Sequence, residues 1–197
     1  MSVLLQLQKR TMAIAGLVMM LYLIFHMISN LSFFTERSFT HFYDWYNEGV
    51  IRWLVLLAVI FALFVHVKAA VRIRQVNANT RIINYKKYDK FKIPPQLVTA
   101  SISFLLGFII IHIIQTLSFD TRSLYTELVH LFQSGWMLLF YLAGLLVLGL
   151  HLHHSLANVL QTLGKTSVVY SRMAFTISFL LNGGFALLPL YIYFEMS

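Results

Sequence analysis

The sequence has no cysteine among its 197 residues and few charged side chains. Without thiols, disulfides, thiolate metal sites and cysteine-ligated iron–sulfur clusters are excluded within this chain. Only 11% of the residues are charged, whereas a soluble domain of this length carries about a quarter. Together with a mean hydropathy of +0.75 and several apolar runs of roughly 20 residues, this scarcity of charge indicates a protein of the lipid bilayer.

A Pro/Gly/Ser-rich linker, an internal repeat and a low-complexity tract are also missing, which favours a single membrane domain over residues 1–197. The first apolar stretch lacks a small-residue cleavage site and is too long for a signal peptide, so we expect it to be retained. The net charge is +8, but the basic residues sit in short segments between apolar spans. This distribution is typical of membrane topology and argues against binding to nucleic acid.

Five apolar runs predict five transmembrane α-helices and hence an all-α integral membrane bundle. Each run is long enough to cross a hydrocarbon core of about 30 Å at a rise of about 1.5 Å per residue. The expected helices cover approximately residues 11–33, 51–72, 97–119, 135–156 and 172–194.

The basic residues are distributed unevenly over the two sides of this bundle. Twelve of the fifteen lysines and arginines fall on one side, which the positive-inside rule assigns to the cytoplasm. The N-terminus is therefore expected on the cytoplasmic side and the C-terminus outside. The twelve residues are Lys9, Arg10, Lys68, Arg72, Arg74, Arg81, Lys86, Lys87, Lys90, Lys92, Lys165 and Arg172.

Four of the eight histidines lie well inside an apolar span, one on each of the first four expected helices: His26, His66, His112 and His151. An imidazole in hydrocarbon needs a partner, and an ionisable residue within the membrane is a candidate for function. One such histidine is more simply explained by a hydrogen bond to a neighbouring helix. Four of them on successive helices favour a shared role.

The depths of these histidines sort them into two pairs. At about 1.5 Å per residue, His26 and His112 lie about 21–22 Å from the cytoplasmic ends of their helices. His66 and His151 lie similarly far from the outer ends, because their helices run in the opposite direction. We therefore expect an outer pair, His26 and His112, and an inner pair, His66 and His151.

Two imidazoles at each of two depths are what two haems b require, because a porphyrin leaves two axial positions on the iron. Zinc prefers one compact cluster of ligands, which two separated pairs do not offer. His154, one turn after His151, is the alternative ligand, although its depth puts it close to the headgroups. Lys9, Arg10 and Lys165 flank the inner pair and are candidates either for binding haem propionates or for ordinary anchoring at the membrane surface.

Glycines near the histidines leave two interpretations open. Gly144 lies two turns before His151, and Gly149 lies close to it. Such small residues either make room for a flat macrocycle or let neighbouring helices pack closely.

Motifs in the first and fourth expected helices, together with the order of one histidine on each of four helices, carry a resemblance to a known family. The motifs are Lys9-Arg10, Met12-Ala13, Gly16-Leu17, His26-Met27, Asn30-Leu31, His151-Leu152 with His154, and Gln161-Thr162-Leu163-Gly164. Over nearly its whole length the sequence resembles the single-chain, dihaem cytochrome b anchors of succinate:quinone oxidoreductases and quinol:fumarate reductases. In that family the first and third helices hold one haem and the second and fourth the other, which agrees with the two pairs.

The resemblance implies the rest of an electron-transfer complex in the bacterial cytoplasmic membrane. A flavoprotein and an iron–sulfur subunit would dock on the cytoplasmic face, against the first residues, the segment from Arg72 to Lys92 and the turn around Lys165. Electrons would pass from the iron–sulfur subunit through two haems to a quinone, often menaquinone, or in the reverse direction in a fumarate reductase. The dicarboxylate chemistry would lie on a partner subunit.

Quinone chemistry needs proton donors and acceptors near the carbonyl oxygens. The segment between the first two expected helices supplies His41, Asp44 and Glu48, and the next outer segment supplies Glu127 and His130. Glu48 stands at the start of the second helix and is the first choice among the quinone-site candidates, followed by Asp44 and His41. Each of them is explained equally well as a solvated loop residue.

Two alternatives remain open. The chain could be the cytochrome b subunit of a membrane hydrogenase or formate dehydrogenase, although the Gln-Thr-Leu-Gly ending and the even spread of histidines favour the first interpretation. A proton relay or transporter without haem would use the same histidines, but polar residues that could bind a substrate are sparse in the spans.

Overall fold

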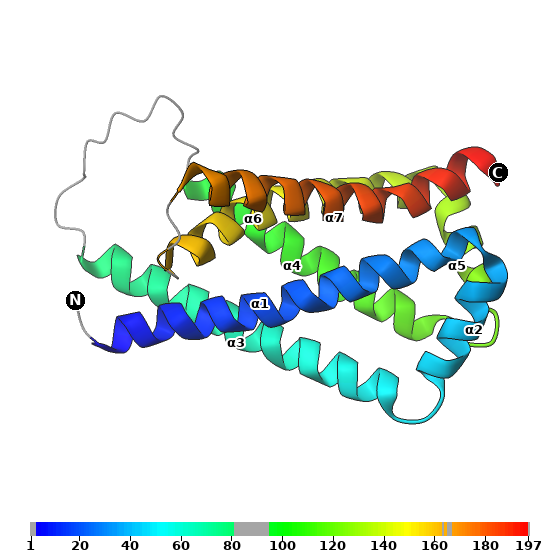
Figure 1. The fold of residues 1–197 in the computed structure, drawn as a ribbon, viewed down its shortest axis with the longest axis horizontal. Helices are drawn as coiled ribbons and strands as arrows, with labels where there is room; N and C mark the ends of the chain where they lie inside the picture. Colours follow the sequence, from blue (N-terminus) through cyan, green and yellow to red (C-terminus); the bar gives the residue numbers. More distant parts are fainter. Residues whose placement is uncertain (1–2, 81–94, 163, 165–166, 197) are drawn as a thin grey trace. The chain divides into compact units, whose positions relative to one another are not determined.

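The computed structural model describes residues 3–80, 95–162, 164 and 167–196, and within these ranges it contains helices and no strands (Figure 1). Five of the helices are long and apolar enough to cross a membrane. The predicted all-α membrane fold with five spanning helices is thereby confirmed. The five are α1 (Val3–Leu31), α3 (Ile51–Thr80), α4 (Pro95–Ser118), α6 (Gly135–Thr162) and α7 (Val168–Glu195).

The spanning helices extend beyond their apolar runs, so several predicted limits are wrong. α1 begins at Val3 instead of residue 11, and α3 ends at Thr80 instead of residue 72. α6 ends at Thr162 instead of residue 156. No glycine or proline interrupts these extensions, and the first is built mainly from leucine, glutamine, lysine and arginine, which have high helix propensity. Hydropathy marks the apolar part of a helix, whereas helical backbone continues into polar residues that have good helix propensity.

Two shorter helices that the search for apolar runs does not predict are α2 (Glu36–Asn47) and α5 (Leu124–Gln133). Both are amphipathic: Phe39 of α2 and Phe132 of α5 are buried, while polar residues of each helix face outward. Each carries a glutamate in its first turn, where the helix dipole favours a negative charge. A short 3-10 turn, Ser32–Phe34, precedes α2.

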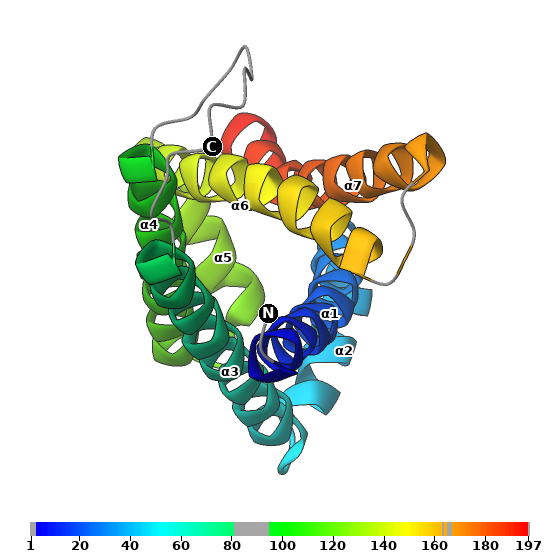
Figure 2. The same ribbon diagram turned by 90° about the vertical axis from the view of Figure 1, so that its left-hand side faces the viewer.

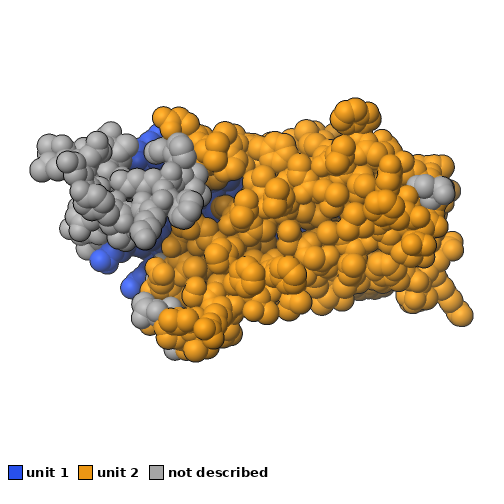
Figure 3. Space-filling view, turned by 90° about the horizontal axis from the view of Figure 1, so that it is seen from above, with its two compact units in different colours: residues 1–23, 50–93 blue, residues 24–49, 94–197 orange. Residues whose placement is uncertain are grey.

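The chain divides into two compact units, coloured separately in Figure 3. Unit 1 comprises residues 1–23 and 50–93, and so contains most of α1 and all of α3. Unit 2 comprises residues 24–49 and 94–197, with the end of α1, the two amphipathic helices and α4, α6 and α7.

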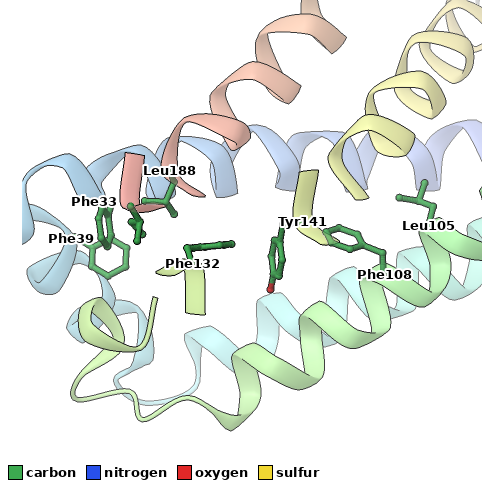
Figure 4. Packing of buried hydrophobic residues seen from close by; sticks show 8 residues of the cluster. Phe33, Phe39, Leu105, Phe108, Phe132, Tyr141 and Leu188 are labelled. Carbon is green, nitrogen blue, oxygen red and sulfur yellow. The ribbon is translucent and has the colours of Figure 1, made fainter. Parts of the chain in front are cut away.

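The main apolar core belongs to unit 2. α6 and α7 lie side by side along much of their length (Figure 1, Figure 2). The buried face of α7 repeats every three or four residues, from Ala174 to Ile192, as a helix facing a partner does. Aromatic side chains of α2, α5, α4 and α6 join this core (Figure 4). Its buried members are Phe33, Phe39, Leu105, Phe108, Phe132, Tyr141, Leu188 and Ile192.

Large apolar side chains are exposed on all five long helices. Leu21 of α1, Phe61 of α3 and Ile114 of α4 are each more than half exposed, as are Leu146 of α6 and Phe179 of α7. In water such surfaces would promote aggregation. Within a bilayer they contact lipid chains, as membrane-spanning helices require.

Candidate functional site

The outer pair meets within unit 2. His26 is on the part of α1 that belongs to this unit, and His112 is on α4. The centroids of the two imidazole rings are 5.9 Å apart, and the ring planes are tilted by 54°. Both side chains are half-buried. Two residues far apart in the sequence, paired only by their calculated depth, are therefore neighbours in the fold.

Aromatic rings and a thioether pack around this pair. Phe185 of α7 lies 5.5 Å from the ring of His26, and Phe108, one turn before His112, lies nearly parallel to the latter ring at 6.2 Å. Beside His26, the sulfur of Met27 sits against Gly184, where a Cβ atom would collide with it. Packing on several sides restricts the orientation of both imidazoles and keeps their surroundings apolar.

His112 is also tied into a chain of polar side chains. Its Nδ1 lies 3.2 Å from the hydroxyl oxygen of Tyr141 on α6. Tyr141 in turn donates to Oε1 of Gln115 at 2.9 Å, and Nε2 of Gln115 donates to the sulfur of Met137 at 3.6 Å. Buried polar groups in a membrane span need such partners, because neither lipid nor water satisfies them there.

In unit 1, the side chain of His66 on α3 is held by the backbone of α1. Its Nδ1 lies 3.0 Å from the carbonyl oxygen of Met12, and since a carbonyl can only accept, Nδ1 carries the proton. Gly16, one turn after Met12, lies against this ring: a Cβ atom there would be 3.4 Å from both Nδ1 and Cε1, at van der Waals contact. In this tautomer the lone pair of the imidazole is on Nε2.

The ring separation of the outer pair fits haem ligation. Two imidazoles that bind one metal ion from opposite sides at about 2 Å have ring centres roughly 6 Å apart, close to the separation of His26 and His112. Haem needs only two ligands from the protein, because the porphyrin supplies the other four. Over the described ranges, no group of three or more histidines, aspartates or glutamates could hold a metal ion.

The three histidines near the end of α6 differ in exposure. His151 is half-buried, whereas His153 and His154 are exposed, and the ring of His153 packs edge-on against Phe175 at 5.7 Å. This difference agrees with the preference for His151 over His154 as a ligand. His151 belongs to unit 2 and His66 to unit 1, and their pairing stays a prediction.

Two of the three candidate propionate residues lie in α1. Lys9 is half-buried and Arg10 exposed, and both lie inside α1 rather than before it, because the helix begins at Val3. Lys165 lies outside the described residues, as do five of the basic residues between Arg72 and Lys92. These five are Arg81, Lys86, Lys87, Lys90 and Lys92.

The glycines of α6 make room for side chains of neighbouring helices. The ring of Phe108 on α4 occupies the space of a Cβ atom on Gly144. A Cβ atom on Gly149 would lie 2.9 Å from the amide nitrogen of Asn182 on α7. Of the two interpretations of these glycines, close helix packing is the one that these contacts support.

The quinone-site candidates lie on and after α2. His41 and Asp44 are exposed and line an open hollow with Glu36, Arg37 and Thr40. Asp44 also lines a second cavity of about 220 Å³ between α2 and residues 121–126. Glu48 is exposed immediately after α2 and lines neither hollow. The fold thus brings His41 and Asp44 together and leaves the first-choice residue apart from them.

Three polar residues of unit 2 that sequence reasoning does not single out are Tyr43, Gln115 and Tyr141. The hydroxyl of Tyr43 lies 3.2 Å from Ser29 Oγ and donates to Asn30 Oδ1 at 3.2 Å, and burial raises the pKa of Tyr43 to about 12. Tyr141 and Gln115 lie within apolar spans, where the argument applied to the histidines would also have marked them. Restricting that argument to histidine is what missed them.

Comparison with known proteins gives no match: no family model, no curated protein and no solved structure matches this chain.

Proposed function

We propose that this chain is the dihaem cytochrome b membrane anchor of a succinate:quinone oxidoreductase or quinol:fumarate reductase. The outer pair would bind one haem b and the inner pair the other. A flavoprotein and an iron–sulfur subunit would dock on the cytoplasmic face and carry the dicarboxylate chemistry. A membrane quinone, in the first place menaquinone, would exchange electrons with the complex near the outer pair.

The observation that carries this proposal is the meeting of His26 and His112, with ring centroids 5.9 Å apart, inside an apolar span. A structural histidine is satisfied by hydrogen bonds to neighbouring helices, and this need does not explain why two imidazoles from separate helices lie next to each other. The tautomer of His66 adds support. Because Nδ1 donates a hydrogen bond to the carbonyl oxygen of Met12, the lone pair of this ring is on Nε2, as a metal-binding imidazole requires.

Bound haem would supply one-electron chemistry, because its iron alternates between the ferric and ferrous states. The chain's own residues would bind and orient it. Nitrogens of the two pairs would hold the iron, and rings such as Phe108 and Phe185 would keep water away from the outer pair. Such an apolar shell tunes a redox potential by lowering the local dielectric.

At the outer end, the residues proposed to handle quinone protons are His41 and Asp44, because they share one hollow. Glu48 ranks behind them, since it lies outside that hollow. Lys9, near the start of α1, and Arg72, in the last third of α3, would contact the soluble subunits.

The proposal is tested by purifying the protein in mild detergent and recording a reduced-minus-oxidised spectrum, with haem quantified per chain. We expect two b haems per chain. His112→Ala should lose one of them, because an iron with a single imidazole is held far less firmly. His153→Ala is the matched control, since this exposed histidine belongs to neither pair and its variant should keep both haems.

A colourless protein would reject the cytochrome assignment and favour the proton relay. One haem in the unmodified chain would show that one of the pairs is wrongly assigned. Co-purification with a flavoprotein that carries covalent flavin would favour the proposed complex over a membrane hydrogenase or formate dehydrogenase.

A further inference from the structure

The polar chain from His112 through Tyr141 to Gln115 has a defined direction. Tyr141 has one hydroxyl proton, which it gives to Oε1 of Gln115 at 2.9 Å. The amide of Gln115 is held in that orientation because its Nε2 donates to the sulfur of Met137, an acceptor for N–H groups. With its proton committed, the oxygen of Tyr141 can only accept from His112, so Nδ1 of that ring carries a proton.

The packing around Tyr141 leaves its hydroxyl little freedom. The side chain is buried, and its ring lies edge-on to Phe108, Phe132 and Phe140 at centroid distances of 5.4, 4.9 and 5.8 Å. Figure 4 shows the hydroxyl pointing from α6 toward α4. Gln115 follows His112 by one turn of α4 and therefore lies on the same face of that helix. On α4, His112 thus provides a donor and Gln115 an acceptor for the hydroxyl of Tyr141.

We infer that Tyr141 and Gln115 are positioning residues for the outer haem, the one proposed to bind to His26 and His112. This inference rests on the proposed function. They hold His112 in the tautomer that has its lone pair on Nε2, and they increase the electron density on that nitrogen. A hydrogen bond from the remote ring N–H to an acceptor raises the basicity of a metal-binding imidazole. A more basic axial ligand stabilises ferric iron and lowers the reduction potential of the haem.

The test is a potentiometric titration of the detergent-purified, haem-loaded protein and its variants, followed by absorbance. Tyr141→Phe keeps the ring in the core and removes the hydroxyl, so it should retain both haems and raise the potential of one of them. Gln115→Leu should raise the same potential by no more than this, because Tyr141 remains but is polarised less. Gln115→Leu also leaves the aromatic core intact, so it can be measured even if Tyr141→Phe folds poorly.

The double variant separates positioning from packing. If Gln115 acts through Tyr141, adding Gln115→Leu to Tyr141→Phe should produce no further shift in potential. Tyr193→Phe is the matched control: its hydroxyl lies beside Gly135 instead of a histidine, and its removal should leave both potentials unchanged.

Two haems with unchanged potentials in Tyr141→Phe, or shifts that add in the double variant, would overturn the inference and leave the proposed function standing. An unmodified protein without haem would overturn the proposed function, and the inference with it.

Discussion

His112 and His66 are held in the same tautomer by different kinds of acceptor. In unit 2, Nδ1 of His112 faces a side-chain hydroxyl that is itself part of a polar chain. In unit 1, Nδ1 of His66 faces a backbone carbonyl of α1, and Gly16, one turn later, lies against the same ring. Both arrangements present Nε2 as the basic nitrogen, so the sequence can reach one chemical outcome by two routes.

The difference determines how each site responds to substitution. A side-chain acceptor disappears with one mutation and can be tuned by its neighbours. A backbone carbonyl persists whatever side chain it carries, so the His66 site can be disturbed only by changing access to that carbonyl. We therefore expect steric variants to dominate at His66 and polar variants at His112.

The largest effect is expected from Gly16→Leu. A Cβ atom at this position would already touch the ring of His66, at 3.4 Å, so the rest of a leucine side chain should displace the imidazole, and one haem per chain should be lost. Haem quantification against protein concentration provides the measurement. Gly107→Leu is the control, because a Cβ atom on Gly107 has no neighbour within 4 Å. Retention of two haems by Gly16→Leu would contradict the assignment of His66 as a ligand.

A smaller effect is expected from Gly144→Ala in unit 2. The new methyl group would collide with the ring of Phe108, which packs against both His112 and Tyr141. Overpacking of this kind costs about 1–3 kcal/mol, so the midpoint of thermal unfolding in detergent should fall. Gly107→Ala, in open space on a helix, should be neutral or stabilise by up to about 1 kcal/mol. Equal midpoints for the two variants would contradict the contact.

The smallest effect is expected from Met12→Leu. The substitution changes the side chain but keeps the carbonyl that accepts from His66, so haem content and both reduction potentials should be unchanged. The contrast with Tyr141→Phe, measured in the same titration, tests the distinction between backbone and side-chain acceptors directly. A shift of potential in Met12→Leu would mean that its side chain, and not its carbonyl, determines the behaviour of His66.

Much of the fold could be predicted from hydropathy, because a bilayer imposes long apolar helices and excludes open strands. The number of spanning helices follows from this requirement. The two amphipathic helices were not predicted. Phe39 and Phe132 are buried on one face of a short helix, and hydropathy averaged over about 20 residues does not detect such a face. The limits of α1 and α3 were not predicted, because the helical backbone continues into polar residues that a search for apolar runs leaves out.

The candidate site, too, could be predicted only in part from the sequence. The pairing of His26 with His112 could be anticipated, because helix rise converts sequence position into depth. The partners of the histidines could not. The direction of Tyr141 depends on how α4 and α6 pack, and the carbonyl of Met12 has no side-chain signature at all. A glycine such as Gly16 marks such an approach only after the facing ring is known.

The turn after α2 has a practical consequence for locating the chain in the membrane. Gly49 adopts a φ of 67°, nothing lies within 4 Å of its missing Cβ, and the next residue, Val50, is 67% exposed. Because the native chain has no thiol, a single cysteine placed at Val50 would be its only reactive site for a maleimide. A reagent that cannot cross membranes would then label intact cells if this turn faces outward, as the positive-inside rule predicts. Labelling at Val50 would therefore show on which side of the membrane the turn after α2 lies.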